Sequence, residues 1–124
     1  MPTKRILIVD DEESIQTVVQ FGSQMVADWE VLIARSGPQG IKTACDKSPD
    51  AILLDVMMPD IDGIATFKAL QADPQTAQIP VIFLTAKAQT SERRQFNDLG
   101  VSGVITKPFN SLDLPDQIMK MLDW

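Results

Sequence analysis

Polar residues suited to phosphate and metal chemistry stand directly after four hydrophobic runs of this sequence. The runs and the residues that follow them are Ile6 to Val9 with Asp10 and Asp11, Ala51 to Leu54 with Asp55, Val81 to Leu84 with Thr85, and Gly103 to Ile105 with Thr106 and Lys107. Three carboxylates brought together would repel one another strongly unless a cation lay between them. Because the set offers oxygen ligands without sulfur or imidazole, the expected ion is magnesium or manganese.

The same residues could carry out phosphoryl transfer, which depends on positioning and charge neutralisation more than on proton transfer. Asp55 is the candidate nucleophile, since its carboxylate can accept a phosphoryl group as a mixed anhydride. Magnesium and the Lys107 ammonium would neutralise phosphoryl oxygens, and the Thr85 hydroxyl would donate a hydrogen bond to another. Asp55, Thr85 and Lys107 are therefore the catalytic candidates, and Asp10, Asp11 and Asp55 are the candidate metal ligands.

These residues meet only if the hydrophobic runs are strands of one sheet. Short, continuous apolar runs separated by helical patterns are typical of a parallel sheet covered by helices on both faces. In such sheets the ligand site lies beyond the carboxyl ends of the strands. The four runs, with Glu30 to Ala34 as a further strand, therefore predict one site at one edge of the sheet.

Five helical patterns alternate with these five strands. They cover Glu13 to Asp28, Pro38 to Asp46, Ile64 to Ala72, Ser91 to Leu99 and Ser111 to Leu122. With right-handed crossovers, the alternation predicts a doubly wound α/β fold of the flavodoxin-like type, with five strand-helix units and strand order 2-1-3-4-5. Gly100 is expected to end the fourth helix.

The apolar stripes of the first and last helices predict which residues cover the sheet. In the first helix these are Ile15, Val18, Val19, Gly22 and either Met25 or Val26. In the last helix they are Leu114, Ile118, Met121 and Leu122, with Met119 and Trp124 outside the stripe.

Composition restricts the class of protein. The 124 residues are enough for one domain, so we expect residues 1–124 to form it without a second folded module. The 17 acidic residues outnumber the 11 basic ones, and no basic stripe with interleaved aromatics is present, which argues against direct nucleic-acid binding. The absence of histidine excludes zinc sites built on imidazole and nucleophile pairs of the Ser-His type.

The single cysteine and the short apolar runs bear on the compartment. Cys45 has no second cysteine with which to form an internal disulfide, and we expect it to be a packed helix residue. No apolar run approaches the length of a membrane span, and no secretion signal is present at the amino terminus. A cytoplasmic protein that is not inserted in a membrane is therefore expected.

The motifs around the candidate site resemble those of receiver domains of the bacterial response-regulator family, over nearly the whole chain. They are Ile-Leu-Ile-Val-Asp-Asp-Glu, Leu-Leu-Asp-Val-Met-Met-Pro with Asp-Gly following, Phe-Leu-Thr-Ala, and Thr-Lys-Pro-Phe. The resemblance implies that Asp55 accepts a phosphoryl group from a histidine kinase or a histidine phosphotransfer protein. It also implies direct Mg²⁺ binding by Asp11, Asp55 and the backbone carbonyl of Met57, with Asp10 acting through water. Thr85 would be the switch hydroxyl and Lys107 the phosphate-binding lysine.

A receiver of this kind would be a signalling switch that catalyses only its own phosphorylation and dephosphorylation. By resemblance, the kinase or phosphotransfer protein would dock on the first helix near Ser14, Ile15 and Val18 and on the loop around Pro108 and Phe109. The fourth helix, the last strand and the last helix would carry the contact with an unknown protein target or a phosphorylation-dependent homodimer.

Three departures from the family pattern are Val104, Met57 and Lys87. Met57 and Lys87 stand two residues after Asp55 and Thr85, where receivers tune hydrolysis of their own acyl phosphate. Val104 stands where many receivers carry a Tyr or Phe that rotates inward on phosphorylation. Movement of the loop from Ala86 to Thr90 and of the start of the fourth helix is therefore expected to transmit the phosphorylation signal instead. Met57 cannot orient an attacking water by hydrogen bonding, which predicts slow loss of the phosphoryl group.

Two other functions use similar residues. Phosphatases of the haloacid-dehalogenase type also combine a strand-end Asp nucleophile with magnesium, Thr and Lys. They place a second acid two residues after the nucleophile, however, where this chain has Met57. A flavodoxin-like nucleotide binder would need a glycine- and hydroxyl-rich phosphate loop after the first strand, and the sequence there is Asp-Asp-Glu-Glu.

Overall fold

The structure, a computed structural model, describes residues 4–56, 63–86, 90–107 and 109–124. Its strands are β1 (Arg5–Val9), β2 (Glu30–Ala34), β3 (Ala51–Asp55), β4 (Val81–Thr85) and β5 (Gly103–Thr106). They form one parallel sheet in the order β2-β1-β3-β4-β5, which confirms the predicted fold and strand order. Because all strands run in the same direction, the residues that follow them gather at one edge.

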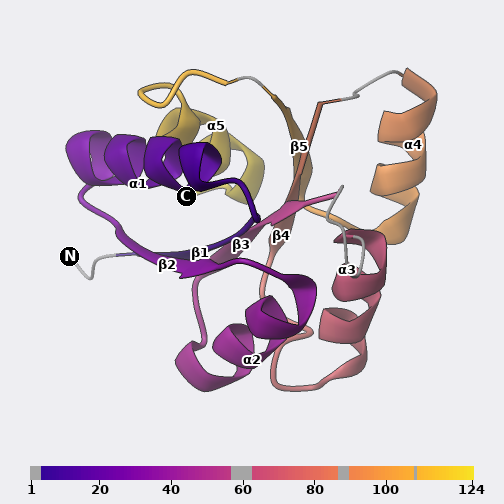
Figure 1. Ribbon diagram of the computed structural model, residues 1–124. Helices are drawn as coiled ribbons and strands as arrows, with labels where there is room; N and C mark the ends of the chain where they lie inside the picture. Colours follow the sequence, from indigo (N-terminus) through magenta and orange to yellow (C-terminus); the bar gives the residue numbers. More distant parts are fainter. Residues whose placement is uncertain (1–3, 57–62, 87–89, 108) are drawn as a thin grey trace.

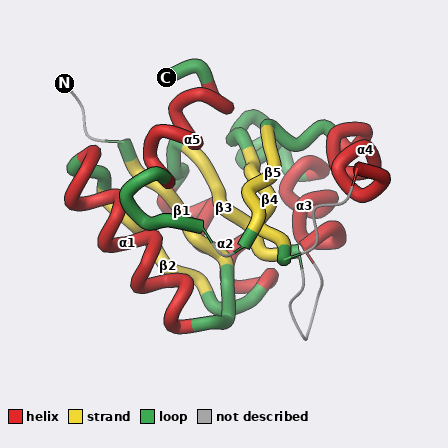
Figure 2. The backbone as a smooth tube through the Cα atoms, turned by 90° about the horizontal axis from the view of Figure 1, so that it is seen from above, coloured by secondary structure: helices red, strands yellow, loops and turns green. Residues whose placement is uncertain are grey.

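Helices cover both faces of this sheet (Figure 1). One face carries α1 (Glu13–Ala27) and α5 (Leu114–Leu122), and the other carries α2 (Gly37–Lys47), α3 (Gly63–Ala72) and α4 (Thr90–Leu99). Figure 2, turned by 90°, shows the strands between α1 on one side and α3 and α4 on the other. No helix among the described residues is both long and apolar enough to cross a membrane.

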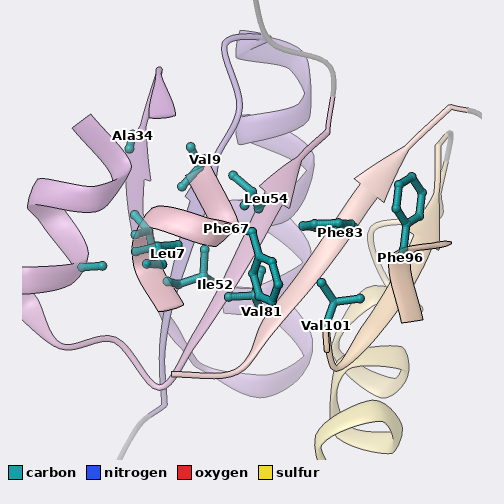
Figure 3. Close-up of a cluster of buried hydrophobic side chains, with 12 residues drawn as sticks. Leu7, Val9, Ala34, Ile52, Leu54, Phe67, Val81, Phe83, Phe96 and Val101 are labelled. Atoms are coloured by element: carbon teal, nitrogen blue, oxygen red, sulfur yellow. The ribbon is translucent and has the colours of Figure 1, made fainter. Parts of the chain in front are cut away.

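The sheet separates two apolar cores because alternate residues of a strand point to opposite faces. Phe83 of β4 lies at the centre of the core under α3 and α4, with its ring edge-on to Phe67 at 5.6 Å and to Phe96 at 5.2 Å between ring centroids (Figure 3). The core under α1 and α5 includes Val19 and Ile118, both fully buried. Burial on both faces explains why the strands read as continuous apolar runs.

The last helix begins later than the sequence predicted, at Leu114 rather than Ser111. The Asn110 side chain accepts a hydrogen bond from the Leu112 backbone N–H at 2.9 Å, and the Asp113 N–H donates to the Asn110 carbonyl at 3.1 Å. These bonds form a turn, and Pro115 then occupies the first helical turn, where its missing N–H is not needed. The other predicted helix bounds agree with the structure to within one residue.

The predicted core stripe of α1 was wrong at its carboxyl end. Met25 and Val26 are 68% and 46% exposed, whereas Gln16 and Ser23 are buried. Gln16 lies three residues before Val19 and Ser23 four residues after it, so the buried face of the helix includes two polar residues that a pattern of apolar residues does not predict. Gly22 lies where predicted, and its backbone is so close to the Ser111 carbonyl that a side chain would not fit.

Met119 and Trp124 were both predicted to lie outside the core stripe of the last helix, and the structure corrects the prediction for Met119. Met119 was expected outside the core stripe of α5, but it is partly buried and packs against the core under α1 and α5. Trp124 is 37% exposed and lies edge-on to Trp29, with 5.5 Å between ring centroids.

Gly100 ends α4 with a positive φ of 97°, as expected of a glycine at this position.

Candidate active site

Backbone hydrogen bonds hold the ends of the strands together at the carboxyl edge. Just beyond the strands, the sheet pattern continues with Asp10 N–H to the Ala34 carbonyl at 3.0 Å, Val56 N–H to Leu84 at 3.0 Å and Lys107 N–H to Thr85 at 2.8 Å. Thr85 itself pairs with Thr106 across β4 and β5. The backbones that carry the predicted site residues are therefore part of the sheet.

The three candidate metal ligands come together at this edge. Ligand oxygens of Asp10, Asp11 and Asp55 all lie within 4.8 Å of one another. Asp10 is 0% and Asp55 3% exposed, while Asp11 is exposed to solvent. Two buried carboxylates at this separation need a positive charge beside them, and the exposed third one leaves a side open to water. The oxygen-only set fits a hard divalent cation.

Lys107, which directly follows β5, supplies a positive charge to the site. Its ammonium lies 2.8 Å from Asp10 Oδ2, 3.5 Å from Asp55 Oδ1 and 3.6 Å from Glu12 Oε1. Burial by itself lowers the pKa of Lys107, but the hydrogen bond to Asp10 and the charges of Asp10, Asp55 and Glu12 outweigh it and raise the pKa. The lysine therefore stays charged at neutral pH.

Asp10 and Asp11 are adjacent in sequence but differ in their partners. Asp10 Oδ1 accepts a hydrogen bond from the Glu12 backbone N–H at 2.8 Å, and its Oδ2 accepts from Lys107. Within the described ranges, no hydrogen bond or ion pair holds the Asp11 side chain. Asp11 is thus the acid that is open to a new ligand, while both oxygens of Asp10 already have partners.

Glycine at position 63 permits α3 to approach the nucleophile candidate closely. A Cβ atom on Gly63 would lie only 2.4 Å from the Asp55 carbonyl oxygen. The Gly63 N–H donates to the Val56 carbonyl at 2.9 Å. This contact fixes the backbone that follows Asp55, and only glycine avoids a clash there.

The remaining predicted residues have different outcomes. Thr85 is buried, with 3% exposure, at the end of β4 next to β5. Met57 and Pro108 lie outside the described residues, as does most of the loop from 86 to 90. In the predicted docking area, Ser14 is exposed, and Ile15, Val18 and Phe109 are half-buried. Val104 packs against the core under α3 and α4.

Two residues of the site were not predicted from the sequence. Glu12 places its carboxylate near Lys107, and the buried Gln16 side chain donates to the Asp10 backbone carbonyl at 2.7 Å. Glu12 follows the acid pair directly, so its charge was a usable signal. Gln16 offered none, because a lone polar residue in a helix is usually on the solvent side.

Comparison with known proteins identifies the family. The family model for the response regulator receiver domain matches residues 6–119. The chain belongs to the response-regulator receiver family. This membership favours the receiver over the haloacid-dehalogenase type of phosphatase, which shares the strand-end Asp.

A curated relative and two solved structures illustrate this likeness. The alkaline phosphatase synthesis transcriptional regulatory protein PhoP of Bacillus subtilis is 36% identical over 119 residues, which are 96% of this chain and 48% of that protein. The chain spans about half the length of the first curated relatives it matches.

The structure of chemotaxis response regulator CheY4 of Vibrio cholerae has a TM-score of 0.89 and 28% identity, covering 97% of this chain and 99% of that one. The receiver domain of a sensor histidine kinase from Pseudomonas aeruginosa has a TM-score of 0.86 and 26% identity, covering 99% and 100%. That second structure holds a magnesium ion coordinated in its active-site cleft.

Proposed function

We propose that this receiver is a phosphorylation switch in which Asp55 accepts a phosphoryl group in the presence of Mg²⁺. The observation that carries the proposal is the contact of one ammonium with two buried acids. Lys107 lies 3.5 Å from Asp55 and 2.8 Å from Asp10. Such a concentration of buried charge is unfavourable for folding alone and suits a site that binds a charged group.

The chemistry can be followed atom by atom. A carboxylate oxygen of Asp55 attacks the phosphorus of a phosphohistidine, and the bond from phosphorus to the imidazole nitrogen breaks as its electron pair returns to the ring. The product is an aspartyl phosphate, a mixed anhydride, and the charge that accumulates on the phosphoryl oxygens must be neutralised. Lys107 is close enough to Asp55 to provide part of that neutralisation. The Thr85 hydroxyl would donate to a phosphoryl oxygen.

The donor set fits a magnesium ion. Bound Mg²⁺ would neutralise carboxylate and phosphoryl oxygens together. Asp11 and Asp55 are the residues that would hold it directly, with the Met57 carbonyl as a further ligand. Asp10 would act through water, because both of its carboxylate oxygens already accept hydrogen bonds. The cleft-bound magnesium of the similar sensor-kinase receiver supports this choice of metal.

The partners follow from the proposed reaction. The donor would be a histidine kinase or a histidine phosphotransfer protein, and the phosphorylated receiver would act on a protein target or pair with a second copy. The receiver would catalyse only its own phosphorylation and dephosphorylation.

Intact mass measurement after treatment with a small acyl phosphate tests the proposal. One phosphoryl group should be added with Mg²⁺ and none after chelation, and Asp55→Asn should abolish the addition. Asp50→Asn is the matched control, because Asp50 precedes the opposite end of β3 and contacts the Arg5 backbone N–H. Unchanged labelling in Asp55→Asn would refute the assignment. Repeated turnover of phosphate monoesters would instead indicate a phosphatase.

A further inference from the structure

The buried side chain of Gln16 connects the first turn of α1 to the acid pair. Its amide Nε2 donates to the backbone carbonyl of Asp10 at 2.7 Å, and Gln16 is only 3% exposed. Its own backbone N–H donates to the Glu12 carbonyl at 3.2 Å. Gln16 therefore ties two points of the loop between β1 and α1 to the helix.

The Asp10 carbonyl belongs to the peptide unit that leads into Asp11. A peptide unit is planar, so a hydrogen bond to its oxygen also restricts the position of the next Cα atom. The Asp11 side chain is exposed, and no residue that the structure describes gives it a hydrogen bond or an ion pair. Its direction therefore depends on the backbone that carries it.

Asp10 has a partner at each of its four polar groups. The N–H donates to Ala34, the carbonyl accepts from Gln16, Oδ1 accepts from the Glu12 N–H and Oδ2 accepts from Lys107. Of these four contacts, only the one from Gln16 is made to the peptide that joins the two acids. This contact is therefore the one suited to orient Asp11.

We propose that Gln16 is a positioning residue for the metal site, which holds the peptide between Asp10 and Asp11 so that the Asp11 carboxylate faces the cation. The inference rests on the proposed function for the identity of the cation. Residues that orient metal ligands commonly affect metal affinity by about tenfold or more, although they do not touch the ion. Gln16→Met keeps the length of the side chain and removes the donor, so it tests this contact directly.

Calorimetric titration with Mg²⁺ should show about tenfold weaker binding by Gln16→Met than by the unaltered protein. With Mg²⁺ at saturation, the rate of phosphoryl addition to Asp55 should be close to that of the unaltered protein, because Asp55 belongs to β3 and Lys107 directly follows β5, whereas Gln16 holds the loop after β1. In metal-free protein, amide hydrogen exchange of Glu12 should be faster, since its N–H donates within the loosened loop. Unchanged Mg²⁺ affinity, whatever the rate at saturation, would overturn the proposal.

Val19→Ala is the control for general destabilisation. Val19 is fully buried one turn further along α1 and packs in the core rather than at the site. At a temperature where both variants are folded, Val19→Ala should bind Mg²⁺ like the unaltered protein. An equal loss of affinity in both variants would mean that α1 acts only through stability, and would refute positioning by Gln16. If the unaltered protein binds Mg²⁺ in a Gln16-dependent way but accepts no phosphoryl group, the proposed function fails and the positioning role stands.

Discussion

The amino and carboxyl ends of the strands, here called the amino edge and the carboxyl edge of the sheet, both carry ion pairs. The two pairs differ in their surroundings. At the amino edge, Arg5 and Glu30 approach to 3.1 Å with side chains 40% and 54% exposed. At the carboxyl edge, Lys107 and Asp10 approach to 2.8 Å with side chains 11% and 0% exposed. The distances are similar, so the difference lies in how much water surrounds each pair.

This difference separates a solvent-exposed ion pair from a buried one. Charges in contact with water gain little from pairing, and such pairs contribute about 0 to 1 kcal/mol. A buried carboxylate without a partner is strongly destabilising, so each charge at the carboxyl edge depends on the others. By this measure the Arg5–Glu30 pair contributes little to stability, whereas the buried charges at the carboxyl edge lower folding stability unless they are paired, as expected of the proposed metal and phosphate site.

The largest expected effect is on stability, in Lys107→Met. Removing the ammonium leaves Asp10 fully buried beside Asp55, and we expect the free energy of unfolding to fall by about 3 kcal/mol without metal. Added Mg²⁺ should recover part of the loss, because it binds the folded state. Urea denaturation in chelator and in Mg²⁺ measures both quantities. A loss below about 1 kcal/mol would place this contact with the exposed pairs.

The pH dependence of this effect follows from the raised pKa of Lys107. A raised pKa in the folded state means that the contribution is complete below the ordinary value of 10.5 and is lost as the pH rises through the folded value. The stability difference between Lys107→Met and the unaltered protein should therefore stay constant from about pH 7 to pH 9. A difference that disappears across this range would contradict the charged state of the lysine.

A smaller effect is expected on metal binding, in Asp11→Asn and Asp10→Asn. Asp11 has no competing partner among the described residues, so losing its charge should weaken Mg²⁺ binding by about 2 kcal/mol, or roughly thirtyfold. Asp10 is already engaged by Glu12 and Lys107, so Asp10→Asn should weaken binding by only a few-fold. Calorimetric titration of the two variants compares them directly. Equal losses would mean that both acids contact the ion in the same way.

The sequence predicted the carboxyl edge well because the site depends on backbone topology. Once the strands are parallel and in the order 2-1-3-4-5, Asp10, Asp55, Thr85 and Lys107 must gather at one edge. The sequence did not predict which side chain Lys107 contacts. We expected the lysine to neutralise phosphate, and in the structure its ammonium lies nearest to Asp10, because side-chain packing decides which acid it meets.

The errors in α1 have a common physical cause. Hydrophobicity predicts burial only on average, and a polar residue is buried when a specific partner satisfies it. Gln16 has such a partner in the Asp10 carbonyl, and that partner cannot be known before the loop is built. Met25, in contrast, is 68% exposed at the far end of the helix although it is apolar. Periodicity therefore located the helix but not all of its buried positions.

The smallest effect is expected at the amino edge, in Arg5→Gln. This variant removes the ion pair with Glu30 but keeps the backbone N–H that donates to Asp50 at 2.8 Å. We expect the free energy of unfolding to change by no more than about 0.5 kcal/mol and the Mg²⁺ affinity to stay the same. Because Arg5 also donates to the Lys47 carbonyl at 3.0 Å, a double-mutant cycle with Glu30→Gln is needed to isolate the pair. A coupling energy above about 1 kcal/mol would show that exposure alone does not separate the two edges.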